Sequence, residues 1–501
     1  MVNYSFVVDH RRCIGCHACS VACKEENGVP LGAYRTWVKY IEKGKFPDTR
    51  RYFTVLRCNH CDDAPCIRIC PTKALFRRPD GIVDFDPKLC IGCKSCMQAC
   101  PYDALYIDPN SNTAAKCHFC AHRVEVGLRP ACEIVCPTQA IISGDLDDPH
   151  SVVSRLVASQ VVHVRKPEQG TKPKVFYIQA DASGLTPTAT AQPATYMWAQ
   201  AHPSYHEHVQ KAHEAKARTV YNVEHTSHPW GLKVAAYLWT KSIAAGALLV
   251  AALAPLLRWP QEPVLFGVAA PSLSLGFLLL TTCLLIIDLK RPDRFHYILL
   301  HPNPSSWLVW GAWILMAFGL VASGWLAGGL MGSRGLLDLL RLPGGILAAA
   351  AAGYSALLFG QAEGRDFWQS PLLLWHLLVA AVLSGAACLL LLGQGLGLGA
   401  VVWRLSRLLT AALIVNVILI AAELFGPHAN QDAHQAAHLV TRGPFRASFW
   451  GGVVLAGTLL PLLLLTWGEP TGLTFVGLLT LVGLGIYEYL WVKAGQVIPL
   501  S

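Results

Sequence analysis

The chain has 501 residues, of which 53% are hydrophobic, and this length exceeds that of one ordinary domain. Its 41 Lys and Arg residues against 32 Asp and Glu give a formal net charge of +9. No basic cluster is interleaved with aromatic residues in a recognisable binding module, so we expect no nucleic-acid partner. Lys and Arg placed at membrane borders explain the excess better.

Cysteine dominates the N-terminal part. Sixteen of the 18 cysteines lie within the first 136 residues, in four groups of four. The C-x2-C-x2-C-x3-C-P run among them is the bacterial ferredoxin signature, in which the fourth cysteine serves the other cluster of a pair. Sixteen thiolates match four [4Fe–4S] clusters, so the sequence predicts an electron carrier. The groups are Cys13, Cys16, Cys19 and Cys23; Cys58, Cys61, Cys66 and Cys70; Cys90, Cys93, Cys96 and Cys100; and Cys117, Cys120, Cys132 and Cys136.

Two other uses of cysteine fit this spacing less well. A disulfide scaffold needs a secreted, oxidising context. Zinc sites use two C-x2-C pairs for each metal, and not triplets with a distant fourth ligand. The remaining two cysteines, Cys283 and Cys388, stand in apolar runs, where a free cysteine packs as a small hydrophobe.

We expect residues 1–180 to form an α+β ferredoxin-like domain with tandem bis-[4Fe–4S] units. An internal repeat supports this: Cys-Pro-Thr-Lys-Ala-Leu starts at Cys70, Cys-Pro-Tyr-Asp-Ala-Leu at Cys100 and Cys-Pro-Thr-Gln-Ala-Ile at Cys136. The pair Arg11-Arg12 resembles a twin-arginine signal, but Cys13 follows directly and no apolar stretch comes after it. We therefore expect no export of this domain.

Residues 181–230 are rich in Ala, Thr, Pro and His and are predicted to be a linker. Their histidines, which include His225 and His228, suggest a metal or haem site, whereas a solvated connector explains them more simply. The nearest match to the C-x-x-C-H haem motif lies at Cys13, inside a ferredoxin motif that already uses both cysteines.

Residues 231–501 are predicted to form an all-α membrane domain of eight transmembrane helices, because a span needs roughly twenty apolar residues. A soluble helical core is the alternative, but eight such runs joined by short polar loops disfavour it. An even number of spans places the cluster domain and the C-terminus on one side. The predicted spans are 234–254, 264–287, 307–328, 344–361, 371–393, 405–425, 449–467 and 471–492.

The distribution of Lys and Arg in the loops favours the cytoplasm for that shared side. We therefore expect a multi-pass protein of a bacterial inner membrane, with its cluster domain in the cytoplasm. Polar side chains inside a bilayer are costly and usually functional. Tyr237 and Lys241 lie four residues apart, on one face of the first span, and Asp288 closes the second. Together with His225 and His228 they are our candidates for a quinone pocket.

Both halves resemble parts of one kind of respiratory complex. The four cysteine groups, with Pro130-Ala131 before Cys132, are similar to the iron–sulfur subunits of molybdopterin oxidoreductases such as polysulfide and dimethyl sulfoxide reductase. The membrane half resembles the NrfD/PsrC family of quinone-reactive subunits, in the stretches from Pro229 to Gly246 and from Asp288 to Trp313. The resemblance implies a fusion of the two parts. It also implies a molybdopterin-containing catalytic partner, and menaquinone or ubiquinone as the bound substrate.

The resemblance further implies crossed ligation of the clusters. Electrons would pass along them to or from a quinone bound where the cluster domain meets the first four helices. We expect no substrate chemistry in this chain, because every cluster cysteine is engaged and no nucleotide fingerprint is visible. An iron–sulfur anchor or a proton-translocating subunit without its own quinone site is the alternative. The implied ligand sets are Cys13, Cys16, Cys19 and Cys136; Cys23, Cys117, Cys120 and Cys132; Cys58, Cys61, Cys66 and Cys100; and Cys70, Cys90, Cys93 and Cys96.

Overall fold

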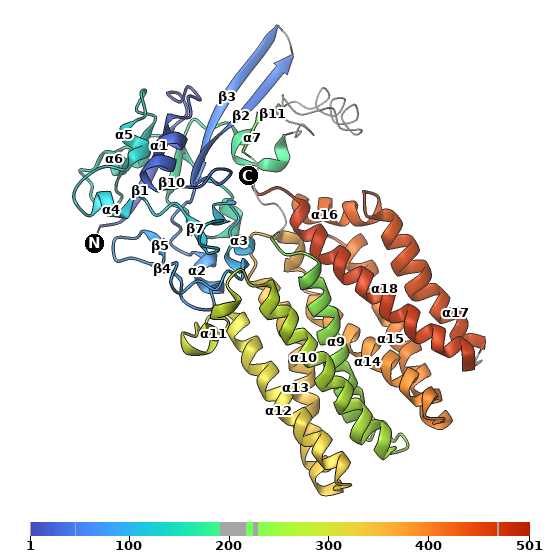
Figure 1. Cartoon of the computed structure of the whole chain (residues 1–501). Helices are drawn as coiled ribbons and strands as arrows, with labels where there is room; N and C mark the ends of the chain where they lie inside the picture. The colour runs from blue at the N-terminus through green and yellow to red at the C-terminus, as the bar shows by residue number, and fades with distance from the viewer. Residues whose placement is uncertain (1, 46, 191–216, 224–228, 468–469) are drawn as a thin grey trace. The chain divides into compact units, whose positions relative to one another are not determined.

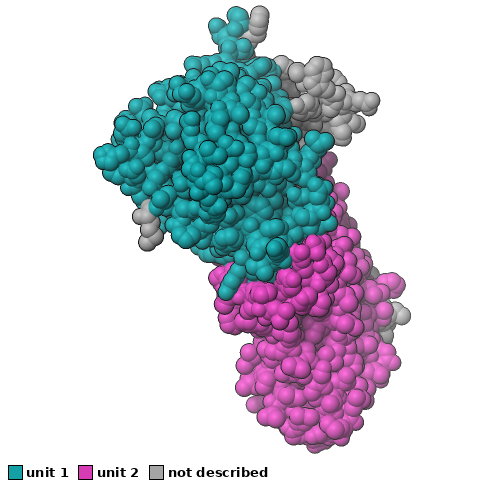
Figure 2. Space-filling model, turned by 60° about the vertical axis from the view of Figure 1, so that its left-hand side comes forward, with its two compact units in different colours: residues 1–229, 362–364, 499–501 teal, residues 230–361, 365–498 magenta. Residues whose placement is uncertain are grey.

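The computed structural model describes residues 2–45, 47–190, 217–223, 229–467 and 470–501. The chain divides into two compact units, which Figure 2 shows in teal and magenta. Unit 1 comprises residues 1–229 with the short segments 362–364 and 499–501, and unit 2 comprises residues 230–361 and 365–498. Unit 1, which contains the four cysteine groups, combines α and β structure, and unit 2 is helical, which confirms the predicted fold class.

Unit 1 is built from short elements (Figure 1). Its strands are β1 (Tyr4–Asp9), β2 (Thr36–Lys45), β3 (Asp48–Arg57), β4 (Leu75–Arg77), β5 (Val83–Phe85), β6 (Leu105–Ile107), β7 (Ala114–Lys116), β8 (Ile141–Asp145), β9 (Val162–His163), β10 (Val175–Ile178) and β11 (Ala217–Tyr221). Its helices are α1 (Ala18–Glu26), α2 (Pro65–Ile69), α3 (Ser95–Ala99), α4 (Ala121–Val124), α5 (Ala131–Ile134), α6 (Val152–Ser159) and α7 (Ala182–Leu185).

A four-stranded sheet in the order β8-β1-β10-β9 organises the core of unit 1. The strand β1 pairs with β8 in antiparallel and with β10 in parallel. Successive side chains of a strand point to opposite faces. Accordingly, Phe6 and Val8 lie in one hydrophobic cluster, while Val7 lies in another with Val153 and Ile178. The central strand is thus buried on both faces.

A long hairpin of β2 and β3 forms a second sheet, with β11 paired on the free edge of β2. Its register places Thr36 opposite Arg57, where the hairpin enters the body of unit 1. At this end the side chains of Trp37, Leu56 and Arg57 are fully buried. The hairpin therefore delivers a charged residue, Arg57, into the interior.

The three repeats seen in the sequence share one local conformation. In each, the third residue after the cysteine has a positive φ, and a strand begins two residues later. The small hairpins β4–β5 and β6–β7 follow the first two repeats, and β8 follows the third. The residues with positive φ and the strand starts are Lys73 (56°) and Leu75, Asp103 (57°) and Leu105, and Gln139 (53°) and Ile141.

Unit 2 contains eight helices that are long and apolar enough to cross a membrane, among the residues that the structure describes, and this confirms the predicted number. The predicted span at 344–361 begins too late, because α13 starts at Arg334 and runs through Pro343. The helices are α9 (Leu232–Leu253), α10 (Ala270–Asp288, preceded by a π-helical turn at Pro263–Ala269), α11 (Tyr297–Leu300), α12 (Trp307–Leu330), α13 (Arg334–Gly360), α14 (Leu373–Gly395), α15 (Gly399–Phe425), α16 (Gln431–Thr441), a π-helix at Ser448–Leu459 that continues as α17 (Leu460–Trp467), and α18 (Pro470–Val497).

The two ends of this run of helices meet. The backbone N–H of Trp230 donates to the Gln496 side chain at 3.1 Å, and the Gln496 amide donates back to the Trp230 carbonyl at 2.8 Å. The Trp230 ring stacks on Trp368, which in turn stacks on Trp491. An even number of spans brings both ends of this run to the same side of the membrane, and these contacts hold them together.

The helix α9 lies at the centre of unit 2. It packs against α10, α13, α14 and α18. Of the 18-residue apolar stretch of α9, 89% is buried inside the protein. Gly246 allows the closest of these approaches, because a Cβ there would collide with the Ala381 carbonyl of α14. Small residues at helix interfaces let membrane helices approach closely. Side chains on α9 are therefore enclosed by other helices and not by lipid.

We predict that Gly246→Ala lowers the stability of unit 2 by about 1–3 kcal/mol, because the added methyl must push α9 and α14 apart. Thermal unfolding of the detergent-solubilised protein, followed by far-UV circular dichroism, measures this. Gly276→Ala on α10 is the control, since nothing lies within 4 Å of a Cβ there. Equal melting temperatures for the two variants would contradict the close approach.

Candidate functional site

Two of the cysteine groups meet through a pair of short helices. Cys66 lies on α2, and Cys70 caps its C-terminus. Cys96 lies on α3, and Cys100 caps its C-terminus. Because α2 packs against α3, the last cysteine of each group comes close to the first three of the other. The other two groups meet in the same way, since α1 packs against α5.

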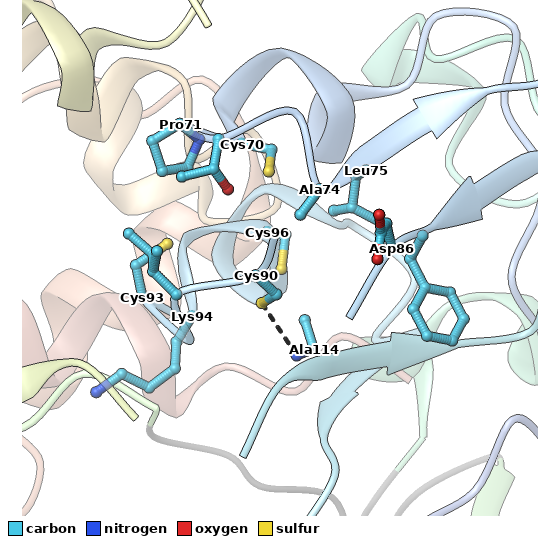
Figure 3. Close-up of a pocket in the computed structure, with 13 residues that line it drawn as sticks. Cys70, Pro71, Ala74, Leu75, Asp86, Cys90, Cys93, Lys94, Cys96 and Ala114 are labelled. Carbon is cyan, nitrogen blue, oxygen red and sulfur yellow. Dashed lines mark hydrogen bonds between the residues drawn. The ribbon is translucent and has the colours of Figure 1, made fainter. Parts of the chain in front are cut away.

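The first resulting cavity has a volume of about 380 Å³ and is lined by Cys70, Cys90, Cys93 and Cys96. Figure 3 shows the four sulfur atoms around this space. The backbone N–H groups of Gly92 and Ala114 each donate to the Cys90 sulfur at 3.4 Å. Gly92 has a φ of 67°, a conformation that glycine adopts without a steric penalty.

The second cavity has a volume of about 270 Å³ and is lined by Cys23, Cys117, Cys120 and Cys132. The Asn27 amide lies 3.7 Å from the Cys23 sulfur and 3.8 Å from the Cys120 sulfur. Both cavities therefore hold three cysteines of one group and the last cysteine of its partner group, which is the crossed arrangement that the resemblance implied.

The other two groups show the same neighbours. Burial and the nearby thiols of Cys58 and Cys100 raise the pKa of Cys61 to about 12. In the remaining group, burial outweighs a backbone hydrogen bond from Gly15 and raises the pKa of Cys13, to which the thiols of Cys136 and Cys16 add. The structure thus gathers two of the predicted ligand sets around cavities and places thiols of the other two sets near one another.

Several of these buried thiols resist ionisation. Burial raises the pKa of Cys93 and of Cys117 to about 12, and neighbouring thiolates contribute to both shifts. Cys136 is an exception: burial opposes its ionisation, but hydrogen bonds from the Ile141 and Ala140 backbone outweigh burial and lower its pKa. Four thiolates around one buried space require a positive centre among them, which an iron–sulfur core supplies.

Buried cations in unit 1 point to the same conclusion. Among the described residues of the unit, seven cationic side chains are buried, but only two carboxylates, Asp9 and Glu133. Buried charges are stable only when they are paired. An interior with this excess of positive charge fits tetrathiolate clusters, which are anionic. The seven cations are Arg35, Lys39, Arg57, Lys94, Lys116, Arg165 and Lys174.

In unit 2, Lys241 lies at the centre of a buried polar cluster. Its ammonium donates to the Ser355 hydroxyl at 2.5 Å and to the Ala352 carbonyl at 3.1 Å, both on α13. It also lies 4.6 Å from the centre of the Tyr354 ring. On α18, Glu488 accepts a hydrogen bond from Ser242, the neighbour of Lys241, at 3.4 Å. We call Tyr237, Lys241, Ser242, Tyr354, Ser355 and Glu488 the Lys241 cluster.

Two of the five sequence candidates for a quinone pocket, Tyr237 and Lys241, belong to this cluster. Tyr237 is buried one turn before Lys241, and Asp288 ends α10, which packs against α9. His225 and His228 lie outside the described residues. Sequence reasoning missed Ser355 and Glu488. The presence of Glu488 inside the predicted span 471–492 was the available signal, since a carboxylate there is costly.

A second polar cluster involves Glu423 on α15. Its carboxylate accepts hydrogen bonds from the Tyr487 hydroxyl at 2.8 Å and from the Trp491 indole at 3.0 Å. His376 on α14 stacks on Tyr487, and its Nδ1 lies 3.9 Å from the carboxylate. Of the other two cysteines, Cys388 is buried as expected, whereas Cys283 is exposed on α10, so the expectation that it packs in a core is wrong.

Comparison with known proteins agrees with this division. The family model described as "Polysulphide reductase, NrfD" matches residues 221–499, more than half of the chain. The protein belongs to the NrfD family. A second model, "4Fe-4S dicluster domain", matches residues 49–146. This NrfD-family protein therefore carries an iron–sulfur part and a membrane part fused in one polypeptide.

Relatives of the iron–sulfur part include components of reductases. The B component of tetrathionate reductase from Salmonella typhimurium is 45% identical over 199 residues, which are 39% of this chain and 80% of the relative. The B component of polysulfide reductase from Wolinella succinogenes is 41% identical over 186 residues, 36% of this chain and 97% of the relative. Protein NrfC of Escherichia coli is 45% identical over 180 residues, 35% of this chain and 81% of the relative.

We predict that Cys23→Ser and Cys120→Ser each remove the same iron–sulfur signal in electron paramagnetic resonance, because both thiols line one cavity. Cys136→Ser should leave that signal and remove the one that Cys13→Ser removes. Cys388→Ser is the matched control and should retain all signals and all iron. Loss of one common signal in Cys23→Ser and Cys13→Ser would mean that each group keeps its own last cysteine.

We also predict that removing iron with a chelator lowers the melting temperature of unit 1. The buried cations then lose their counter-charges, and breaking a buried pair typically costs about 3–5 kcal/mol. Calorimetry before and after chelation measures the change. The helical signal of unit 2 serves as the internal control and should keep its transition. An unchanged transition of unit 1 would contradict charge compensation by the clusters.

Proposed function

We propose that this protein is the electron-transfer and quinone-binding membrane subunit of a molybdopterin oxidoreductase complex. It relays electrons between a catalytic partner subunit and the membrane quinone pool through four [4Fe–4S] clusters. The observation that carries the proposal is the pairing, in one polypeptide, of buried cysteine quartets with a membrane unit that holds a buried lysine.

The four quartets are the proposed ligand sets. Each cluster supplies one-electron chemistry when bound. The residues of the chain fix where that chemistry takes place: the short helices α1, α2, α3 and α5 hold the thiols, and backbone N–H groups donate to sulfur at Cys90 and Cys136. Such hydrogen bonds tune the reduction potentials of clusters.

The Lys241 cluster is the proposed quinone site. Reduction of a quinone takes up two electrons and two protons, so a proton donor must stand at the site. Lys241 and Tyr237 are donors enclosed by apolar helices, and Asp288 lies at the end of α10, where it can exchange protons with them. Ionisable residues within membrane helices are functional by default. His225 and His228 are proposed as further members of this site from the sequence alone.

The names of the relatives support the proposed partner, and the distribution of Lys and Arg supports the proposed orientation in the membrane. Relatives of the iron–sulfur part are named as components of tetrathionate and polysulfide reductases, which supports a catalytic reductase subunit with a molybdopterin as the partner of this protein. We place the protein in the bacterial inner membrane with unit 1 in the cytoplasm, on the positive-inside distribution of Lys and Arg in its loops.

The test is reduction of the clusters by a quinol analogue, followed by visible absorbance of the purified protein. Lys241→Gln should slow this reduction at least about tenfold, the factor expected for losing about 1.4 kcal/mol of stabilisation. Lys233→Gln is the control on the same helix, since Lys233 is exposed. Reduction of Lys241→Gln at the wild-type rate, with its iron content intact, would contradict the proposed site.

An alternative is a proton-translocating or anchoring subunit without a quinone site, which the buried group of Glu423, His376 and Tyr487 favours. Reduction by a quinol analogue, the experiment described above, distinguishes the two functions. A protein with full iron content that no quinol analogue reduces would support the alternative.

A further inference from the structure

Arg57 is a buried cation beside the second cavity. It ends β3, its side chain is 0% exposed, and its Nη1 donates to the Cys132 sulfur at 3.3 Å. Its Nε and Nη2 have no hydrogen-bond partner among the residues that the structure describes. A guanidinium buried in this way needs a nearby negative charge. The thiolates of Cys132 and Cys117 would supply it when they hold a cluster.

The position of Arg57 is fixed by packing. The Phe6 ring lies 4.3 Å from its guanidinium carbon and also packs on Phe119 at 4.0 Å between ring centres. Arg57 pairs with Thr36 in the β2–β3 hairpin, so its backbone is held as well. A side chain held by a strand and an aromatic face loses little freedom when it binds sulfur.

Arg57 lies against one quartet in particular. It lines the second cavity together with Cys117 and Cys132, and the Cys132 sulfur accepts its hydrogen bond. The charge of Arg57 therefore acts most directly on the quartet of the second cavity.

We propose that Arg57 sets the reduction potential of the cluster held by Cys23, Cys117, Cys120 and Cys132. The inference rests on the proposed function, because it takes these thiols as cluster ligands. A cluster that gains an electron becomes more negative, so a fixed buried cation stabilises the reduced form more than the oxidised form. Arg57 therefore raises this potential above that of the same cluster without it. It is a positioning residue that acts through Cys132 and holds electrons at this quartet.

The test is a redox titration of the whole purified protein, followed by electron paramagnetic resonance. Arg57→Gln keeps a hydrogen-bond donor and loses the charge. We expect it to lower the midpoint potential of the affected cluster by about 59 mV, a tenfold change in the ratio of reduced to oxidised cluster for a one-electron couple. The other three quartets should shift less. The signal that Cys23→Ser removes identifies the affected cluster.

Arg51→Gln is the matched control, because Arg51 lies on the same strand, is half exposed and pairs with Glu42. It should leave every potential unchanged. Arg57→Lys keeps the charge and should titrate closer to wild type than Arg57→Gln does. If Arg57→Gln loses the cluster, the potential of Arg57→Lys decides whether the proposal holds. Because this variant keeps the charge, a shift of its midpoint potential by about 59 mV or more overturns the proposal.

An Arg57→Gln protein with its clusters retained and its potentials unchanged would overturn the inference while leaving the proposed function intact. A wild-type protein without four clusters would instead contradict the proposed function. In that case the midpoint potential of the cluster in the second cavity still tests the inference, provided that the signal of this cluster is present.

Discussion

The burial of negative charge is the constraint on which unit 1 depends. Sixteen thiols, which we propose hold four clusters, lie inside unit 1, where an isolated anion is costly. Basic side chains are buried in the same interior. Four of them are fully buried, and among the described residues of unit 1 only two carboxylates are buried. The four are Lys39, Arg57, Lys116 and Arg165. These lysines and arginines would be an unusual core for a protein without anionic cofactors. Their presence ties the stability of the fold to its iron.

The crossed pairing of the quartets has a simple structural origin. In α2 and α3 the last cysteine of a group caps the helix that carries the third cysteine of the same group, and these two helices pack together. The helices α1 and α5, which carry cysteines of the other two groups, also pack together. Packing of one helix against another therefore brings the last cysteine of one group to the first three of its partner group.

The membrane unit follows a different rule. Its core is apolar, so its few buried polar groups must satisfy one another, and α9 brings Lys241 to the place where several helices can supply partners. Ser355 and Glu488 come from α13 and α18. Fusion of the two parts in one polypeptide fixes their ratio at one to one. Separate subunits achieve the same ratio only by assembly.

The sequence by itself determined the chemistry of unit 1 and the number of spans. Spacing reveals cysteine ligands because the short loops and helices around a cluster allow few other arrangements, and length with hydropathy reveals spans because the bilayer has a fixed thickness. Only the tertiary structure decided which partners surround Lys241 and where Arg57 lies. Ser355 and Glu488 are distant from Lys241 in the sequence, and Arg57 reads there as one more basic residue of a strand. Contacts between residues distant in the sequence leave no local pattern, so no motif could reveal where these side chains lie.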